Sequence, residues 1–324
     1  MPSPSNPKPK PAAGAEWRTD LRGEPVLLSP GRAARPYDFR SEAAERRNRC
    51  PFCPGREGET PPEVAAERPA GVPADAPGWS WRVVPNRFPA FPREPAEPGG
   101  AFGVHEVLIE TPDHDRGLGE LSEPELISAL GAWRRRLQAA AADPRLRYAS
   151  LFKNHGPEAG ASLEHSHSQL MAIPFVPARV RAELAAFGSG EAGARLDADA
   201  AHPALRVTGN GGAVAFAPAA SRFPDEVWIA PAAPEACFEE TADVEAPAAV
   251  LRAVLGAMNA LHGRPSYHLL LATAPFRAEG RERWRWRIEV FPRLTKIGGF
   301  EWAGGLFVNQ TDPVDTARRY RAAL

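Results

Sequence analysis

The chain has 324 residues and a mass of 35.0 kDa, with 39 basic and 40 acidic side chains. That length can bury a large core, as one domain or as two of about 150 residues. The balanced charge indicates neither a nucleic-acid nor a membrane partner, and no apolar run reaches the ~18 residues that a membrane span needs. We therefore expect no nucleic-acid partner and no membrane partner.

The three cysteines, Cys50, Cys53 and Cys237, imply no disulfide framework. Such cysteine usage is typical of a cytoplasmic protein. Residues 1–15 are rich in Pro, Ser and Lys and contain no apolar core. This composition predicts a disordered tail rather than a signal peptide.

The first half of the chain reads as short strands, recognised by alternation or by brief apolar runs, with two helices. The expected strands are 16–29, 81–85, 106–110, 148–153 and 166–174. The expected helices are 123–142, with Ser122 as N-cap and Pro124 behind it, and 177–187. Residues 54–78, rich in Pro, Gly and Glu, are expected to form a loop.

Residues 188–204, rich in Gly, Ala and Asp, are the best candidate for a boundary. A strand–helix–strand order then repeats, with strands expected at 214–218, 226–230, 267–272 and 285–291 and a helix at 246–262. The short connections favour antiparallel pairing. We predict an α+β fold of two related halves, 16–190 and 191–324, each an antiparallel sheet with flanking helices.

Cys50-Pro51-Phe52-Cys53 is a Cys-x-x-Cys pair, which can bind zinc through two thiolates. Two further ligands must come from elsewhere, and the candidates are His114 and His165. The alternatives are a redox role for the cysteines, which the lack of a thioredoxin-like βαβ pattern weakens, and a surface position for His114.

The stretch 154–169 sets His165, His167 and Gln169 at alternate positions behind a glycine-rich turn. Alternate residues of a strand project to one face. If His165 binds zinc, His167 is left to act as a nucleophile, with its other nitrogen donating to a backbone carbonyl such as one in the 155–163 turn. The alternative is that both histidines bind metal, or that one is only packed.

These motifs together resemble the galactose-1-phosphate uridylyltransferase family of the histidine-triad superfamily. The resemblance runs from about Trp17 to Pro313 and follows the family's order of motifs. The motifs are SPGRAARP at 29–36, CPFC at 50–53, VVPNRFP at 83–89, TPDH at 111–114, the His-x-His-x-Gln strand, and GGFE at 298–301.

The resemblance implies two histidine-triad-like halves and ping-pong nucleotidyl transfer. His167 would attack the α-phosphorus of a nucleotide sugar, release a sugar 1-phosphate, and pass the nucleotidyl group to a second sugar 1-phosphate. It also implies one zinc per chain and a homodimer. The residues that match the family's catalytic positions are His167, Gln169 and Ser162. Those that match its nucleotide or phosphate contacts are Arg32, Arg35, Asn86, Asn154 and Gly160. Those that match its zinc ligands are Cys50, Cys53, His114 and His165.

One departure concerns the substrate. Bacterial transferases of the family usually carry His-Pro-His, whereas this chain has His165-Ser166-His167. The serine form looks more like the plant-type ADP-glucose phosphorylase branch, which transfers adenylyl to phosphate. We expect a UDP-glucose–hexose-1-phosphate uridylyltransferase. An ADP-glucose phosphorylase is the alternative, and a non-catalytic nucleotide-sugar-binding zinc protein is the alternative of another class.

A second departure concerns a further metal that many members hold with a glutamate and histidines. Glu183 matches that glutamate, but Ala272, Arg287 and, nearby, Glu289 stand where histidines are expected. We expect no second transition metal and a pairing of Arg287 with Glu183 instead. Strand alternation would place Arg283, Arg285 and Arg287 on one face, and the alternative is an ordinary solvated arginine face.

Overall fold

The computed structural model describes residues 15–19, 25–28, 50–98 and 100–324. Residues 1–14, where the tail is predicted, lie outside the described residues, and so do Arg32 and Arg35. None of the helices in the described part of the chain combines the length and the apolar character that crossing a bilayer requires.

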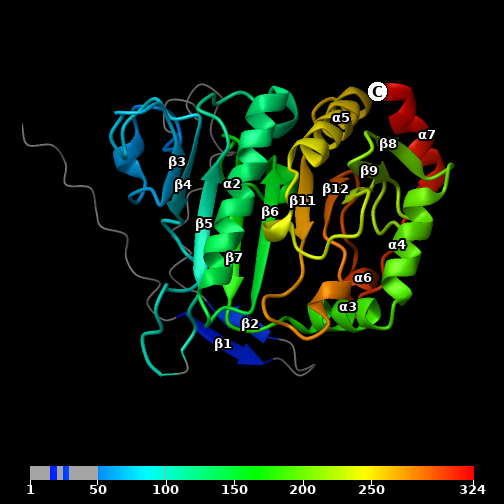
Figure 1. Ribbon diagram of the computed structural model, residues 1–324, viewed down its shortest axis with the longest axis horizontal. Coiled ribbons are helices and arrows are strands. Elements are labelled where there is room, and N and C mark those ends of the chain that lie inside the picture. Colours follow the sequence, from blue (N-terminus) through cyan, green and yellow to red (C-terminus); the bar gives the residue numbers. More distant parts are fainter. Residues whose placement is uncertain (1–14, 20–24, 29–49, 99) are drawn as a thin grey trace, which may run out of the picture.

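One ten-stranded antiparallel sheet organises the described residues (Figure 1), in the order β3-β4-β5-β7-β6-β11-β12-β10-β9-β8. Its strands are β3 (Ala65–Glu67), β4 (Trp81–Pro85), β5 (Val104–Ile109), β6 (Tyr148–His155), β7 (His167–Ile173), β8 (Arg206–Gly209), β9 (Ala213–Phe216), β10 (Val227–Pro231), β11 (Tyr267–Ala272) and β12 (Arg287–Pro292). A separate hairpin pairs β1 (Glu16–Thr19) with β2 (Pro25–Leu28).

The α+β class with antiparallel pairing is confirmed, and the sheets expected in the two halves are joined edge to edge. The junction is the pairing of β6 with β11, which sets Lys153 opposite Leu269. Five strands on one side of this junction lie before residue 174, and five on the other side lie after residue 205. The division of the chain into domains at residue 190 stays a prediction.

Helices α2 (Glu123–Ala142), α5 (Glu245–His262) and α7 (Pro313–Ala323) share the main core with the sheet. The bounds of α2 are those expected, and the backbone N–H of Ser122 donates to the Glu125 carboxylate over 2.7 Å at its start. The periodic positions Leu126, Leu130, Trp133 and Leu137 are all fully buried. Each such side chain contributes roughly 1.5–3 kcal/mol.

Several elements differ from expectation. The predicted boundary over 188–204 contains α4 (Glu191–Ala201), which packs on α3 (Ala178–Gly188), and α6 (Gly299–Gly304) was also not predicted. The prediction of a three-arginine strand face was wrong. Arg283 ends a 3₁₀ turn, and β12 begins only at Arg287.

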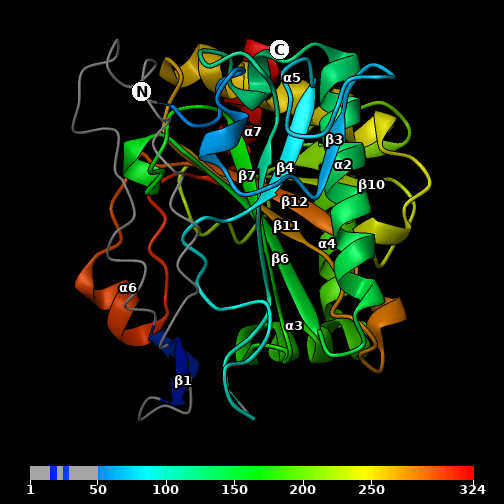
Figure 2. The ribbon, with the colours of Figure 1, turned by 90° about the vertical axis from the view of Figure 1, so that its left-hand side faces the viewer.

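The two faces of the sheet carry different chemistry. Leu108, Leu151 and Leu170 point to the side covered by α2, whereas residues of the opposite parity, such as Val107 and Gln169, point away from it. Figure 2 shows α2 and α6 on opposite sides of the sheet. Alternation therefore separates a buried core face from a face that builds the site.

Candidate active site and metal centre

The four predicted zinc ligands converge. The ligand atoms of Cys50, Cys53, His114 and His165 all lie within 4.8 Å of one another. His165 Nδ1 is 3.6 Å from Cys50 Sγ and 3.7 Å from Cys53 Sγ, and His114 Nδ1 is 3.4 Å from Cys53 Sγ. Tetrahedral zinc, with Zn–S near 2.3 Å and Zn–N near 2.0–2.1 Å, sets sulfur and nitrogen ligands about 3.6 Å apart. The donor set and its spacing fit a zinc ion.

The hydrogen bond of His165 supports this assignment. Its Nε2 lies 2.7 Å from the Thr111 carbonyl oxygen, so Nε2 carries the hydrogen and Nδ1 keeps its lone pair toward the sulfurs. Metal-binding histidines commonly donate their second nitrogen to such an acceptor. On the other side of the cluster, His114 Nε2 is 3.9 Å from the Glu164 carboxylate.

His167 begins β7 and lines a cavity of about 340 Å³. Its Nδ1 donates to the His165 carbonyl oxygen over 2.8 Å, which leaves the Nε2 lone pair available. The acceptor is a backbone carbonyl, as expected, but it belongs to His165, just before β7, and not to the 155–163 turn. Burial, and next the charge of Lys153, lower the pKa of His167 to about 4, so the imidazole is neutral at neutral pH.

Three other predicted site residues line the same cavity, namely Ser162, Gln169 and Asn86. The wall also contains Phe52, whose ring meets the His167 ring edge-on at 5.3 Å. The loop that carries the two cysteines therefore also closes one side of the cavity next to His167.

Asn154 and Gly160 are close in sequence to residues that line this cavity, but they do not line it themselves. Phe152 pairs with Gln169, so alternation puts Asn154 on the same sheet face as Gln169. Its Oδ1 accepts from Nδ1 of His268 over 3.0 Å. Gly160 has a φ of +73°, a conformation that favours glycine, at the end of the turn before Ser162.

Sequence patterns gave no indication of a charged cluster beneath β7. Glu110 accepts from Lys153 Nζ at 2.6 Å and from Ser166 Oγ at 2.7 Å, and Ser168 Oγ also donates to it. Lys153 in turn donates to the His167 carbonyl oxygen at 3.0 Å. Ser166 and Ser168 thus anchor the start of β7 from the core face and point away from the cavity.

Arg287 pairs with Glu183, as predicted, over 2.6 Å. It also contacts the Glu289 carboxylate at 2.6 Å and lies over the Trp228 ring at 4.5 Å. Because Arg287 is buried, this is an internal ion-pair group rather than a solvated arginine face.

Cys237 is buried, and its sulfur accepts a hydrogen bond from Arg281 at 2.7 Å. Burial, and next the charge of Glu239, raise the pKa of the thiol to about 12. A protonated thiol beside a guanidinium is a poor metal ligand, although Glu239 and Glu240 are close to it.

Comparison with known proteins gives the relationship of the whole chain. An ADP-glucose phosphorylase of Arabidopsis thaliana is 32% identical over 328 residues, covering 93% of this chain and 92% of that protein. The chain belongs to the family of galactose-1-phosphate uridylyltransferases and ADP-glucose phosphorylases. A galactose-1-phosphate uridylyltransferase of Thermotoga maritima is 26% identical and covers 73% of this chain and 82% of that protein.

Solved structures agree with this family assignment. An ADP-glucose phosphorylase from Arabidopsis thaliana with bound ADP-glucose has a TM-score of 0.76 at 32% identity, over 94% of this chain and 97% of that one. A uridylyltransferase structure has a TM-score of 0.76 at 28% identity, over 95% and 98%. Residues 135–324 also match a family model described as a domain of unknown function (DUF4921). The resemblance read from the sequence is confirmed, and the chain is an enzyme of this nucleotidyltransferase family.

Proposed function

We propose that this protein transfers an adenylyl group from ADP-glucose to phosphate through a covalent intermediate on His167. The observation that carries the proposal is the orientation of His167, which lines the cavity with Nδ1 bonded to the His165 carbonyl oxygen. Adenylyl is preferred to uridylyl because the likeness to an ADP-glucose phosphorylase is higher in identity and spans more of the chain than that to the Thermotoga uridylyltransferase. Uridylyl transfer, the first expectation from the sequence, is the second candidate.

The proposed reaction has two displacements at the α-phosphorus. Nε2 of His167 forms a bond to phosphorus while the bond to the bridging oxygen breaks, which releases glucose 1-phosphate. Inorganic phosphate then attacks the same phosphorus and releases ADP and the neutral imidazole. Positive charge develops on the ring in the first step, and the His165 carbonyl, already oriented on Nδ1–H, stabilises it without reorganisation.

The other side chains of the cavity suit this reaction. The Ser162 hydroxyl and the Gln169 amide are donors for the phosphate oxygens, and both are buried beside His167. Phe52, Val84 and Val107 supply apolar wall against which a nucleobase can pack.

We further propose one zinc per chain, held by Cys50, Cys53, His114 and His165. Four protein ligands leave no open position, so the ion would act structurally and fix the loop that bears Phe52. No second transition metal is expected, since the Arg287 cation lies between the Glu183 and Glu289 carboxylates. Metal analysis should therefore give one zinc per chain, and two would contradict the proposal.

A homodimer is proposed as well. Around α6, the large apolar side chains of Phe300, Trp302, Leu306 and Val308 are 58–70% exposed, which is unusual for a surface that stays in water. Light scattering after size-exclusion chromatography should give twice the 35.0 kDa chain mass, and a monomer would contradict this.

The deciding experiment is intact-mass measurement after incubation with ADP-glucose or UDP-glucose, followed by peptide mapping. We expect an AMP adduct on His167 that phosphate discharges as ADP, and no adduct in His167→Asn. A UMP adduct would favour uridylyl transfer. Absence of any adduct and any turnover would favour the non-catalytic alternative, and release of free AMP without phosphate would indicate a hydrolase.

A further inference from the structure

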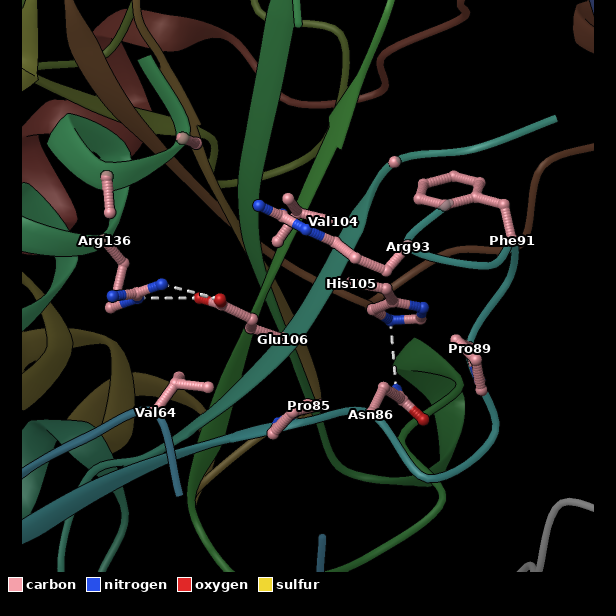
Figure 3. Close-up of a pocket in the computed structure, with 13 residues that line it drawn as sticks. Val64, Pro85, Asn86, Pro89, Phe91, Arg93, Val104, His105, Glu106 and Arg136 are labelled. Carbon is pink, nitrogen blue, oxygen red and sulfur yellow. Dashed lines mark hydrogen bonds and ion pairs between the residues drawn. The ribbon is translucent and has the colours of Figure 1, made fainter. Parts of the chain in front are cut away.

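His105, on β5, is a buried histidine that belongs to none of the motifs found in the sequence. It lies among three polar neighbours, each 3.0 Å away. Its Nδ1 accepts from the backbone N–H of Ala90, and its Nε2 lies near Gln169 Oε1 and near Asn86 Nδ2. Figure 3 shows the ring of His105 directed toward Asn86 and Pro89.

The Ala90 contact decides the tautomer of His105. A backbone N–H can only donate, so Nδ1 must present its lone pair, and in a neutral ring the hydrogen then sits on Nε2. Nε2–H therefore donates to Oε1 of Gln169. This fixes the Gln169 amide with its oxygen on His105 and leaves its NH₂ group for the side where His167 and the cavity lie.

The Asn86 amide is fixed in a similar way from its other end. Its Oδ1 accepts from the backbone N–H of Phe88 over 2.8 Å, so Nδ2 is the atom that approaches His105 Nε2. Both nitrogens carry hydrogen and cannot bond to each other. The NH₂ group of Asn86 therefore needs an acceptor other than His105, and a ligand oxygen in the cavity that Asn86 lines can supply one.

We propose that His105 is a positioning residue, which holds the Gln169 amide with its NH₂ group toward a phosphate-bearing ligand. Without Nε2–H, Gln169 can rotate and present its carbonyl oxygen, which repels a phosphate oxygen. The proposal rests on the proposed nucleotidyl transfer at His167. The role of His105 extends that mechanism by a residue that contacts no reacting atom and acts through Gln169.

The first test is a double-mutant cycle with His105→Leu and Gln169→Ala. Removing a transition-state donor costs about 10²–10³ in rate, so His105→Leu should lower kcat for adduct formation by about 10–100-fold. In the Gln169→Ala background the same change should cost less than about threefold, because its target is gone. An equal loss in both backgrounds would show a merely structural role and overturn the proposal.

His105→Gln is the matched variant, since its amide can place an N–H near the position of Nε2. It should recover most of the activity that His105→Leu loses. Melting temperatures of all variants identify any that fail to fold, and His105→Gln keeps the test decisive if the leucine variant does. Equal inactivity of folded leucine and glutamine variants would count against the proposal.

A second measurement does not depend on activity. Long-range ¹H–¹⁵N correlation of the imidazole nitrogens in the wild-type protein should show His105 with hydrogen on Nε2 and a bare Nδ1, assigned by its loss in His105→Gln. Hydrogen on Nδ1 would overturn the proposal. A wild-type protein that shows the expected tautomer but forms no adduct would refute the proposed function and leave the arrangement of His105 intact.

Discussion

The main-chain oxygen of His165 accepts the Nδ1 hydrogen of His167 over 2.8 Å, while the His165 imidazole lies 3.6 Å from the sulfur of Cys50. The side chain of His165 therefore belongs to the proposed zinc cluster, and its backbone contacts the proposed nucleophile. A displacement at the start of β7 would therefore change both the geometry of the cysteine–histidine cluster and the hydrogen bond of His167. The loop of the two cysteines adds a second connection, because Phe52 contacts the His167 ring.

Loss of the metal ligands should therefore affect both stability and activity. In Cys53→Ser we expect loss of zinc, slower adduct formation and a melting temperature lower by about 10 °C. Several kcal/mol of binding free energy disappear, and each is worth roughly 2–4 °C in a chain of this size. Metal analysis and thermal unfolding measure the outcome. The control is Cys237→Ser, outside the cluster, which should keep its zinc, and a Cys53→Ser variant with full zinc would refute the ligand assignment.

The serine between the two histidines should not select the nucleobase. The Ser166 hydroxyl contacts Glu110 and Lys153 on the core face of the sheet and does not line the cavity. Ser166→Ala should lower the free energy of unfolding by about 1–3 kcal/mol, because Glu110 and Lys153 each lose a buried hydrogen bond. The ratio of kcat/KM for ADP-glucose and UDP-glucose should stay within about twofold. A change of tenfold or more would show that the serine reads the base indirectly.

The sequence predicted those features that repeat locally. The spacing of Leu126, Leu130, Trp133 and Leu137 defined α2, and the bounds expected for β4 and β11 are those observed. Helix α4 was not found because, in its eleven residues, only Gly193 and Leu196 are buried, so its apolar signal is weak. An Ala- and Asp-rich segment with so few apolar positions has a sequence pattern typical of a loop.

The polar residues behind the site could not be found from local pattern. His105 and Lys153 lie on strands, and Glu110 directly follows β5, so their neighbours are set by sheet register; Glu110 and Lys153 are 43 residues apart in the sequence. Alternation along one strand shows which residues share its face, but not which residues of another strand meet them. The proposed zinc ligands and His167 were recognisable because each belongs to a short motif whose residue types indicate the chemistry.

Removing only one partner of the Lys153–Glu110 ion pair should lower the free energy of unfolding strongly. Both side chains are about 1% exposed, and although burial raises the pKa of Glu110, the Lys153 charge holds that pKa below its ordinary value. Lys153→Met leaves a buried carboxylate without its cation, and we expect a loss of about 3–5 kcal/mol in the free energy of unfolding. Adding Glu110→Gln should restore part of it. Urea unfolding of the two single variants and the double variant gives the coupling, and strictly additive losses would contradict the pairing.

His268 should make stability depend on pH. Burial, and next the charge of Arg293, lower its pKa to about 4, whereas in the unfolded chain the pKa is near 6.5. Between these values the unfolded chain binds a proton that the folded chain does not, so the free energy of unfolding falls as pH decreases from about 6.5 to about 4. The contribution of neutral His268 is fully present above that window. Other histidines whose pKa is lowered by desolvation, such as His155, add in the same direction.

The variant His268→Gln removes one titrating group but keeps a side-chain donor for Oδ1 of Asn154. Its free energy of unfolding, measured by urea titration at pH 7.0, 5.5 and 4.5, should fall less steeply with decreasing pH than that of the wild type. The difference between the two slopes should be no larger than the slope that one bound proton contributes. If His268→Gln and wild type lose stability in parallel, His268 is protonated equally in both states, and its bond to Asn154 does not depend on a neutral ring.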